Sequence, residues 1–113
     1  MGQLLEFFRD EKRWTRDRDA RTKSGRSCSS LTHEAYSFSV VGRIRRLAAS
    51  RTITLDERDA LYDKCLNAAI TLRISTRGDR ADMRQLDVCD ALTIVNDSID
   101  HPTLIRWLEE AGV

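Results

Sequence analysis

The sequence predicts an all-α protein: a compact bundle of four to five helices, with a long basic loop between the first helix and the second. Apolar residues recur at helical spacing over most of the chain, as they do in amphipathic helices. One proline and five glycines supply too few turn residues for many short strands. Stretches in which Val, Ile and Thr alternate with polar residues, as in a sheet, are missing as well.

The chain is expected to form a single domain, because its length and an apolar content of 41% suit one hydrophobic core. Within residues 1–113, the expected order is a short N-terminal helix (1–13), a basic surface loop (14–30) and a helical core (31–113). Large apolar side chains on the first helix are too costly to leave in water, so this helix should dock on the body of the domain or, alternatively, on another chain. They are Leu4, Leu5, Phe7 and Phe8.

The predicted loop contains no large apolar residue after Trp14, and Gly25 is its expected turn. Long loops in small domains often carry function. Trp14 has two interpretations: an anchor that holds the loop on the core, or a residue that contacts a partner.

The central helix is predicted over residues 32–50, with Thr32 or Ser30 as its cap. Gly42 in its middle suggests a close helix–helix crossing. Its apolar stripe consists of Tyr36, Val40, Ile44 and Leu47. Arginines in its last two turns suit the negative end of the helix dipole.

The third helix has the clearest start, because Thr54 and Glu57 match the capping box. We expect it to end near Ser75. A fourth helix is predicted from about Arg80 to Val95, with inward-facing residues that include Met83 and Leu86. The segment Asn96-Asp97-Ser98 should break it. A last helix should follow, capped by Asp100, with Pro102 in its first turn and Gly112 at its end.

The residues that usually carry chemistry form no recognisable motif. Cys28, Cys65 and Cys89 are widely spaced without a CxxC pair, and Cys65 and Cys89 should be buried free thiols. His33 and His101 suit solvated turns. No nucleotide-binding loop or serine elbow is present. The sequence therefore predicts no enzyme, no cofactor and no metal site.

The predicted location is the cytoplasm of a host cell. Free cysteines suit a reducing compartment. The first residues, MGQLLEFF, lack the basic region and long apolar run of a secretion signal, and no stretch approaches the length of a membrane-spanning helix.

Charge is divided unevenly along the chain. Residues 1–52 hold 12 Lys or Arg and 6 Asp or Glu, a net charge of +6, and residues 53–113 have a net charge of −5. The two halves could attract each other within one fold. Alternatively, the basic half forms a patch for an acidic partner or a nucleic acid.

The predicted partner-binding residues are the tryptophan and basic residues of the loop, together with three arginines of the central helix. They are Trp14, Arg16, Arg18, Arg21, Lys23, Arg26, Arg43, Arg45 and Arg46.

The order of several short motifs resembles a family of small uncharacterised bacterial and phage domains. The motifs here are Trp14-Thr15, Ala20-Arg21, Gly25, Ala35, Gly42-Arg43-Ile44, Asn96-Asp97 and the final helix Leu104–Ala111. The chain departs from the family pattern at Thr22, where Asp is usual, and at Arg43, where Ala is usual. Phe38-Ser39 stands near the place of a Trp-Cys pair. The resemblance implies a phage or prophage context.

Two functions are expected from these observations. The first is a non-enzymatic interaction protein that binds a larger cytoplasmic protein or ribonucleoprotein complex and modulates or inhibits it, for example a CRISPR-type defence complex. The alternative is a sequence-nonspecific nucleic-acid-binding module that uses the basic loop with Arg43, Arg45 and Arg46. A membrane is not an expected partner, and a homodimer is compatible with either function.

Overall fold

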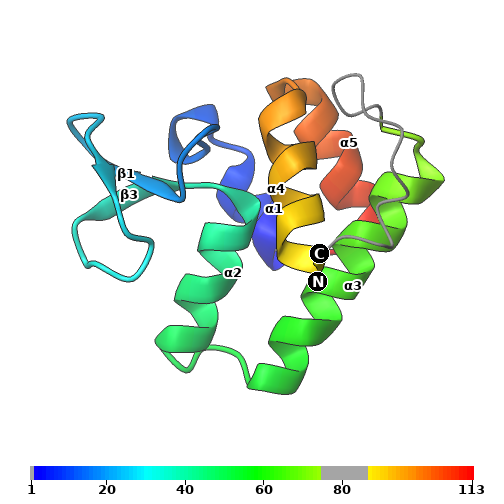
Figure 1. Cartoon of the computed structure of the whole chain (residues 1–113), viewed down its shortest axis with the longest axis horizontal. Coiled ribbons are helices and arrows are strands. Elements are labelled where there is room, and N and C mark those ends of the chain that lie inside the picture. The colour runs from blue at the N-terminus through cyan, green and yellow to red at the C-terminus, as the bar shows by residue number, and fades with distance from the viewer. Residues whose placement is uncertain (1, 75–86) are drawn as a thin grey trace.

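Helices and a small sheet share this chain, so the predicted all-α class is wrong. The computed structural model describes residues 2–74 and 87–113. In chain order these residues form α1 (Gln3–Phe8), a 3₁₀ turn η1 (Glu11–Arg13), β1 (Ala20–Thr22), β2 (Ser27–Cys28), β3 (Ala35–Phe38), α2 (Val40–Ala49), α3 (Leu55–Thr71), α4 (Val88–Ser98) and α5 (His101–Ala111). The sheet lies to one side of the helices, beside the start of α2 (Figure 1).

The predicted loop over residues 14–30 contains the first two strands of an antiparallel sheet with the order β2-β1-β3. Gly25 supplies the expected turn between them, with φ of 95°. Thr22 N donates to Arg26 O at 2.8 Å and closes the hairpin. Strands of three and two residues are too short to leave a periodic signal in the sequence, which is why the sheet was missed.

The predicted central helix over residues 32–50 begins only at Val40, because the residues before it form β3. Tyr36 therefore lies on a strand, where Tyr and Phe alternate with Ser. The helix is capped by Ser39, whose Oγ accepts from Gly42 N at 2.9 Å, rather than by Thr32 or Ser30. Gly42 contacts the backbone of Asp19 and not another helix.

The other predicted caps are confirmed. Thr54 and Glu57 form the reciprocal capping box of α3, with bonds of 2.7 and 3.0 Å. The Asp100 carboxylate accepts from Thr103 N at 3.0 Å and starts α5, which ends at Gly112 with φ of 73°. Helix α3 ends at Thr71, before the predicted end near Ser75.

Helix α4 differs from its prediction. It continues through Asn96, Asp97 and Ser98, the expected breakers, because the Asn96 amide has partners in other elements. The beginning of the predicted helix at Arg80, together with Met83 and Leu86, lies outside the described residues.

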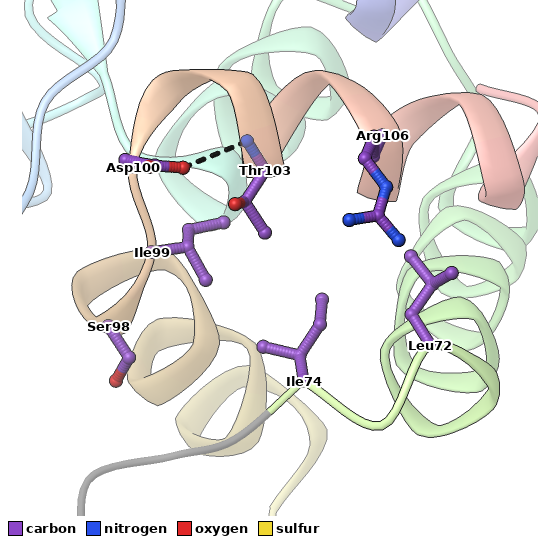
Figure 2. A pocket seen from close by; sticks show the side chains of 7 residues that line it. All are labelled: Leu72, Ile74, Ser98, Ile99, Asp100, Thr103 and Arg106. Carbon is purple, nitrogen blue, oxygen red and sulfur yellow. Dashed lines mark hydrogen bonds between the residues drawn. The ribbon is translucent and has the colours of Figure 1, made fainter.

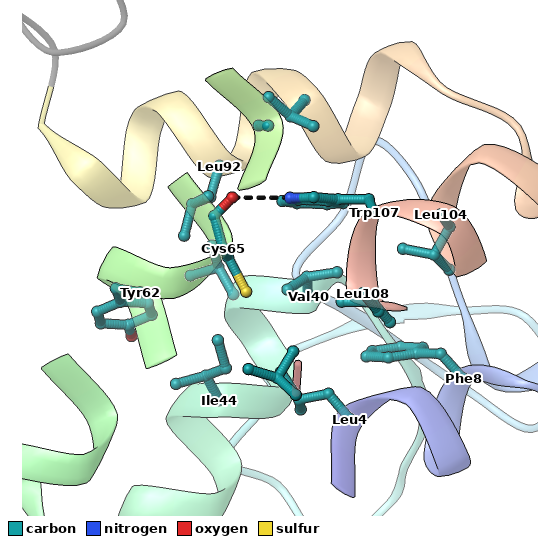
Figure 3. Close-up of a cluster of buried hydrophobic side chains, with 14 of the residues drawn as sticks. Leu4, Phe8, Val40, Ile44, Tyr62, Cys65, Leu92, Leu104, Trp107 and Leu108 are labelled. Carbon is teal, nitrogen blue, oxygen red and sulfur yellow. Dashed lines mark hydrogen bonds between the residues drawn. The ribbon is translucent and has the colours of Figure 1, made fainter. Parts of the chain in front are cut away.

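One core joins the helices to the buried side of the sheet. Figure 3 shows side chains that the helices contribute to it. Trp107 is its largest fully buried side chain, and its Nε1 donates to Cys65 O at 2.7 Å. The other fully buried large residues include Leu4, Phe8, Phe38, Val40, Ile44, Leu92, Leu104 and Leu108. As expected, α1 docks on the body of the domain.

Both ends of the chain lie side by side (Figure 1). Val113 O accepts from Leu4 N at 2.6 Å and from Leu5 N at 3.2 Å. These bonds hold α1 against the end of α5, and so position Phe7 and the turn that follows it.

Candidate functional site

Two arginines from different elements share one aromatic ring. The guanidinium carbon of Arg43 on α2 lies 3.9 Å from the ring centre of Phe7, and that of Arg13 lies 4.9 Å from the same centre. Arg13 also lies 4.2 Å from the ring centre of Tyr36 and donates from Nε to Tyr36 O at 2.7 Å. Cation–π contact holds both charges in fixed places.

A basic pocket continues this arrangement along the sheet. It has a volume of about 390 Å³ and is lined by Lys12, Thr22, Lys23, Gly25, Tyr36 and Ser37. The Lys23 ammonium lies 5.9 Å from the Tyr36 ring centre. We call the surface made by Lys12, Arg13, Lys23 and Arg43 with Phe7 and Tyr36 the cationic face.

No carboxylate of the described residues forms an ion pair with the cations of this face. Across residues 2–74 and 87–113 the ion pairs are Arg9–Glu6, Arg45–Asp19 and Arg58–Asp59, and none involves a residue of the face. None of these pairs joins residues 1–52 to residues 53–113. Within the described residues, the four cations of the face therefore keep their charge without a carboxylate partner.

Arg43 is a cation of the face whose pKa is shifted in the folded protein. Its side chain is half-buried, and burial lowers the pKa of Arg43; the nearby Arg13 and Arg46 guanidinium groups lower that pKa further. Arginine stays charged even so. The folded protein thus holds a poorly solvated positive charge beside others of the same sign.

The cationic face has the charge needed to bind anions. Two described cysteines have a shifted pKa, and neither is activated as a nucleophile. Burial raises the pKa of the Cys65 thiol to about 12. Burial and the carboxylates of Glu34 and Asp19 raise the pKa of Cys28. Both thiols stay protonated at neutral pH. Cys65 is buried as predicted, whereas Cys89 is half-exposed. In the described ranges no three His, Cys, Asp or Glu side chains converge as a metal site would require.

Three of the predicted partner-binding residues are used inside the fold. Trp14 Nε1 donates to Asn96 Oδ1 at 2.8 Å, which supports the anchor interpretation of Trp14. Arg21 donates to Thr15 Oγ1 at 2.8 Å and to a hairpin carbonyl. Arg46 donates to the carbonyls of two residues in the turn before β3.

The remaining predicted residues are dispersed. Arg16 donates to Ile99 O at 3.1 Å beside α5, and Arg18 to the carbonyl of its neighbour. Arg45 pairs with Asp19, and Arg26 is exposed at the hairpin. Lys23 and Arg43 alone belong to the cationic face.

Sequence reasoning missed Lys12, Arg13, Phe7 and Tyr36. Phe7 was assigned to the core and Tyr36 to a helix stripe. No spacing could reveal their contacts, because α1, η1, β3 and α2 meet only in the folded chain. The dense run of basic residues from Arg9 to Arg26 was the one available signal for Arg13.

Two of the motifs that suggested a family resemblance, Trp14-Thr15 and Asn96-Asp97, meet in one hydrogen-bond network. Asn96 is fully buried and binds the Trp14 indole, and its Nδ2 donates to Thr15 O at 3.1 Å and to Asp97 Oδ1 at 3.0 Å. Asp97 Oδ1 also accepts from Asp17 N at 2.9 Å. These motif residues hold the fold together.

A second hollow lies where the end of α3 meets the corner between α4 and α5 (Figure 2). It has a volume of about 300 Å³ and is lined by Leu72, Ile74, Ser98, Ile99, Asp100, Thr103 and Arg106. Ile74 is the last described residue before residue 75, so the lining of this hollow is described only in part.

No protein-family model matches the chain, and neither a curated protein nor a solved structure matches it. The resemblance to small bacterial and phage domains therefore stays a prediction from the sequence. No described helix combines the length and apolar character needed to cross a membrane.

Proposed function

We propose that this protein acts without catalysis, by docking its cationic face on an acidic surface of a larger protein assembly. One observation carries the proposal: Arg13 and Arg43 share the Phe7 ring, and neither has a carboxylate partner among the described residues. Burial and the neighbouring Arg13 and Arg46 lower the pKa of Arg43, so like charges are held together in the folded state. Unfavourable local arrangements of this kind are expected at functional sites.

The geometry of the face suits carboxylate groups. Arg13 lies over the Tyr36 ring and Arg43 over the Phe7 ring. The Nε of Arg13 is bonded to Tyr36 O. Guanidinium groups bind carboxylates through paired N–H donors. Because these side chains are already ordered, little conformational entropy is lost when a partner binds.

A protein partner is favoured over single-stranded nucleic acid. Stacking of bases requires open aromatic rings. Here the Phe7 ring has two guanidinium groups beside it, and the Tyr36 ring has Arg13 and Lys23. The resemblance to phage domains supports a host complex as the partner, with CRISPR-type defence complexes as one example to test.

The decisive experiment compares two charge-reversal variants that carry the same net charge. Lys12→Glu/Lys23→Glu reverses exposed positions of the cationic face, and Arg51→Glu/Lys64→Glu reverses exposed positions outside it. Each tagged protein is incubated with extract from a bacterial host, and bound proteins are quantified by mass spectrometry. We expect the first variant to lose specific partners by about tenfold or more, and the second to retain them.

Duplex and single-stranded DNA of random sequence are titrated in parallel over a series of salt concentrations. Binding that falls steeply with salt and disappears in Lys12→Glu/Lys23→Glu would show a nucleic-acid target and overturn the proposal. Equal loss of protein partners in both variants would also contradict it, because net charge alone would then explain the binding.

A further inference from the structure

Two exposed leucines lie in the same groove on the side of α2 away from Phe7. Among the described residues, the exposed large apolar side chains are Leu31 (58%), Leu55 (61%) and Ile94 (36%). Leu31 and Leu55 both line a groove of about 340 Å³, together with Arg45, Ala48, Ala49 and Arg58. Single exposed leucines are ordinary, but two that share one hollow indicate a contact surface.

The fold holds both leucines in place although neither is buried. Arg46 Nη1 donates to Ser30 O at 3.2 Å and to Thr32 O at 2.5 Å, the carbonyls on either side of Leu31. Leu55 is the first residue of α3 and lies between Thr54 and Glu57, the two residues of the capping box. A partner would therefore meet apolar side chains on an ordered backbone.

The charged groups that line the groove are both arginines. Arg45 is paired with Asp19 at 3.3 Å and Arg58 with Asp59 at 2.9 Å, and neither aspartate lines the groove. Both ion pairs are partly exposed, and pairs at the surface contribute little to stability. Carboxylates of a bound partner can replace these aspartates, so the groove is complementary to an acidic segment.

This groove is separate from the cationic face. Arg43 and Arg45 are two positions apart on α2, which turns their side chains about 200° from each other around the helix axis. Arg43 accordingly lies against Phe7, whereas Arg45 lies against Asp19. The two surfaces can be occupied, and tested, independently.

We propose that the groove binds an acidic segment of a partner protein that inserts a large apolar side chain between Leu31 and Leu55. The apolar side chain lies on Ala48 and Ala49, and flanking carboxylates bind Arg45 and Arg58. This interaction does not depend on the function proposed for the cationic face.

The test uses the ¹⁵N-labelled full chain and a short peptide in which a Leu-Phe pair is flanked on both sides by Glu. Amide chemical shifts should change at Ala48, Ala49 and Leu55, while those of Phe7 and Tyr36 stay constant. Leu31→Glu/Leu55→Glu should weaken binding of the fluorescein-labelled peptide by about tenfold or more. Both positions are exposed, so this variant should fold, and Ile94→Glu is the matched control with unchanged affinity.

Three results would overturn the proposal. The first is an absence of shift changes in the groove at saturating peptide. The second is equal binding of the same Leu-Phe peptide flanked by Lys, because the arginines would then have no role. The third is concentration-dependent self-association that Leu31→Glu/Leu55→Glu abolishes, which would assign the groove to a second copy of this chain.

Discussion

At the scale of single residues, Asn96 joins three parts of the molecule. Its buried Oδ1 accepts from Trp14 Nε1 at 2.8 Å and from Val40 N at 3.1 Å, and its Nδ2 donates to Thr15 O at 3.1 Å. These bonds link α4 to the start of α2 and to the segment before β1. A buried amide with all these partners specifies one arrangement of the elements.

Asn96→Ala should lower the free energy of unfolding by about 3 kcal/mol or more. The substitution leaves the indole N–H, a backbone N–H and a backbone carbonyl without their partners, and each such buried group costs about 1–3 kcal/mol. Urea unfolding followed by circular dichroism measures the change, with Asn67→Ala on the exposed side of α3 as the control. Equal stability of the two variants would show that water replaces the Asn96 amide.

Gly42 is the second residue that the tertiary structure constrains. A Cβ at this position would overlap the backbone O of Asp19, which itself accepts from Ser39 N at 3.0 Å. That carbonyl is therefore poorly placed to move. The close approach joins the segment before β1 to the first turn of α2.

Gly42→Ala should destabilise the protein by about 1–3 kcal/mol through overpacking. On an open helix face, the same change would stabilise by about 1 kcal/mol. Thermal unfolding of the variant distinguishes the two outcomes by sign. In Gly25→Ala the added Cβ meets no atom within 4 Å, so this control measures only the cost of placing alanine at a positive φ. A Gly42→Ala protein that is more stable than the original would rule out the close approach.

At the scale of elements, side-chain caps decide where the helices begin. Ser39, Thr54, Asp87 and Asp100 each accept from a backbone N–H in the first turn of α2, α3, α4 and α5. The hydrogen bond with Thr103 is the main reason that the pKa of Asp100 lies below its usual value. The ionised form of Asp100 is thus favoured by folding.

Asp100 should therefore make the stability of α5 depend on pH. A lowered carboxyl pKa contributes stability above the ordinary pKa of about 3.9, and this contribution is lost as the pH falls through the lower value of the folded state. Asp100→Asn keeps a good cap but cannot titrate. Between about pH 6 and pH 3, the stability of the original chain should fall relative to that of Asp100→Asn. A difference that stays constant in urea titrations over this range would contradict the assignment.

At the scale of the whole molecule, most residues of the cationic face lie on segments that also form part of the fold's helices and hairpin. The face uses the end of η1, the turn of the hairpin and the first half of α2. It brings positive charges together at a cost in stability. Substitutions at these positions should therefore change the free energy of unfolding and the affinity for a partner by different amounts, or in opposite directions.

Arg43→Met should separate these two effects. Losing the cation–π contact removes about 0.5–1 kcal/mol, while the repulsion from Arg13 and Arg46 disappears. We expect the unfolding free energy to change by less than about 1 kcal/mol and partner capture to fall by about tenfold or more.

The matched control is Arg46→Met on the same helix. It should lower the unfolding free energy by about 1–2 kcal/mol, because Ser30 O and Thr32 O lose their donor. If Arg43→Met destabilised the protein as much as Arg46→Met and left capture intact, Arg43 would be a structural residue.

The parts of the fold that could be predicted are those with local causes. The capping box at Thr54, the Asp100 cap, the glycine after α5 and the apolar side of α1 all depend on neighbours within a few positions, and all are confirmed. The sheet depends on pairing of Ala20 with both Cys28 and Phe38. The pairing with Phe38 in particular follows no local pattern.

The candidate site was predicted less well than the fold. Net charge placed the predicted binding residues in the first half of the chain, and two of them, Lys23 and Arg43, belong to the cationic face. Charge alone could not reveal that Arg21 and Arg46 bind carbonyls inside the fold, or that Arg13 stacks on Phe7. For arginine, the choice between an internal role and an external one depends on which acceptors come within reach after folding.

The sequence alone was enough to specify the helix caps at Thr54 and Asp100, the apolar side of α1 and the excess of basic residues before residue 53. Contacts between distant segments specify the β2-β1-β3 sheet, the Asn96 network and the shared ring of Phe7. The physical reason is range: a cap or an amphipathic stripe is satisfied within a few turns, whereas strand pairing and cation stacking require partners that only the packed core brings together.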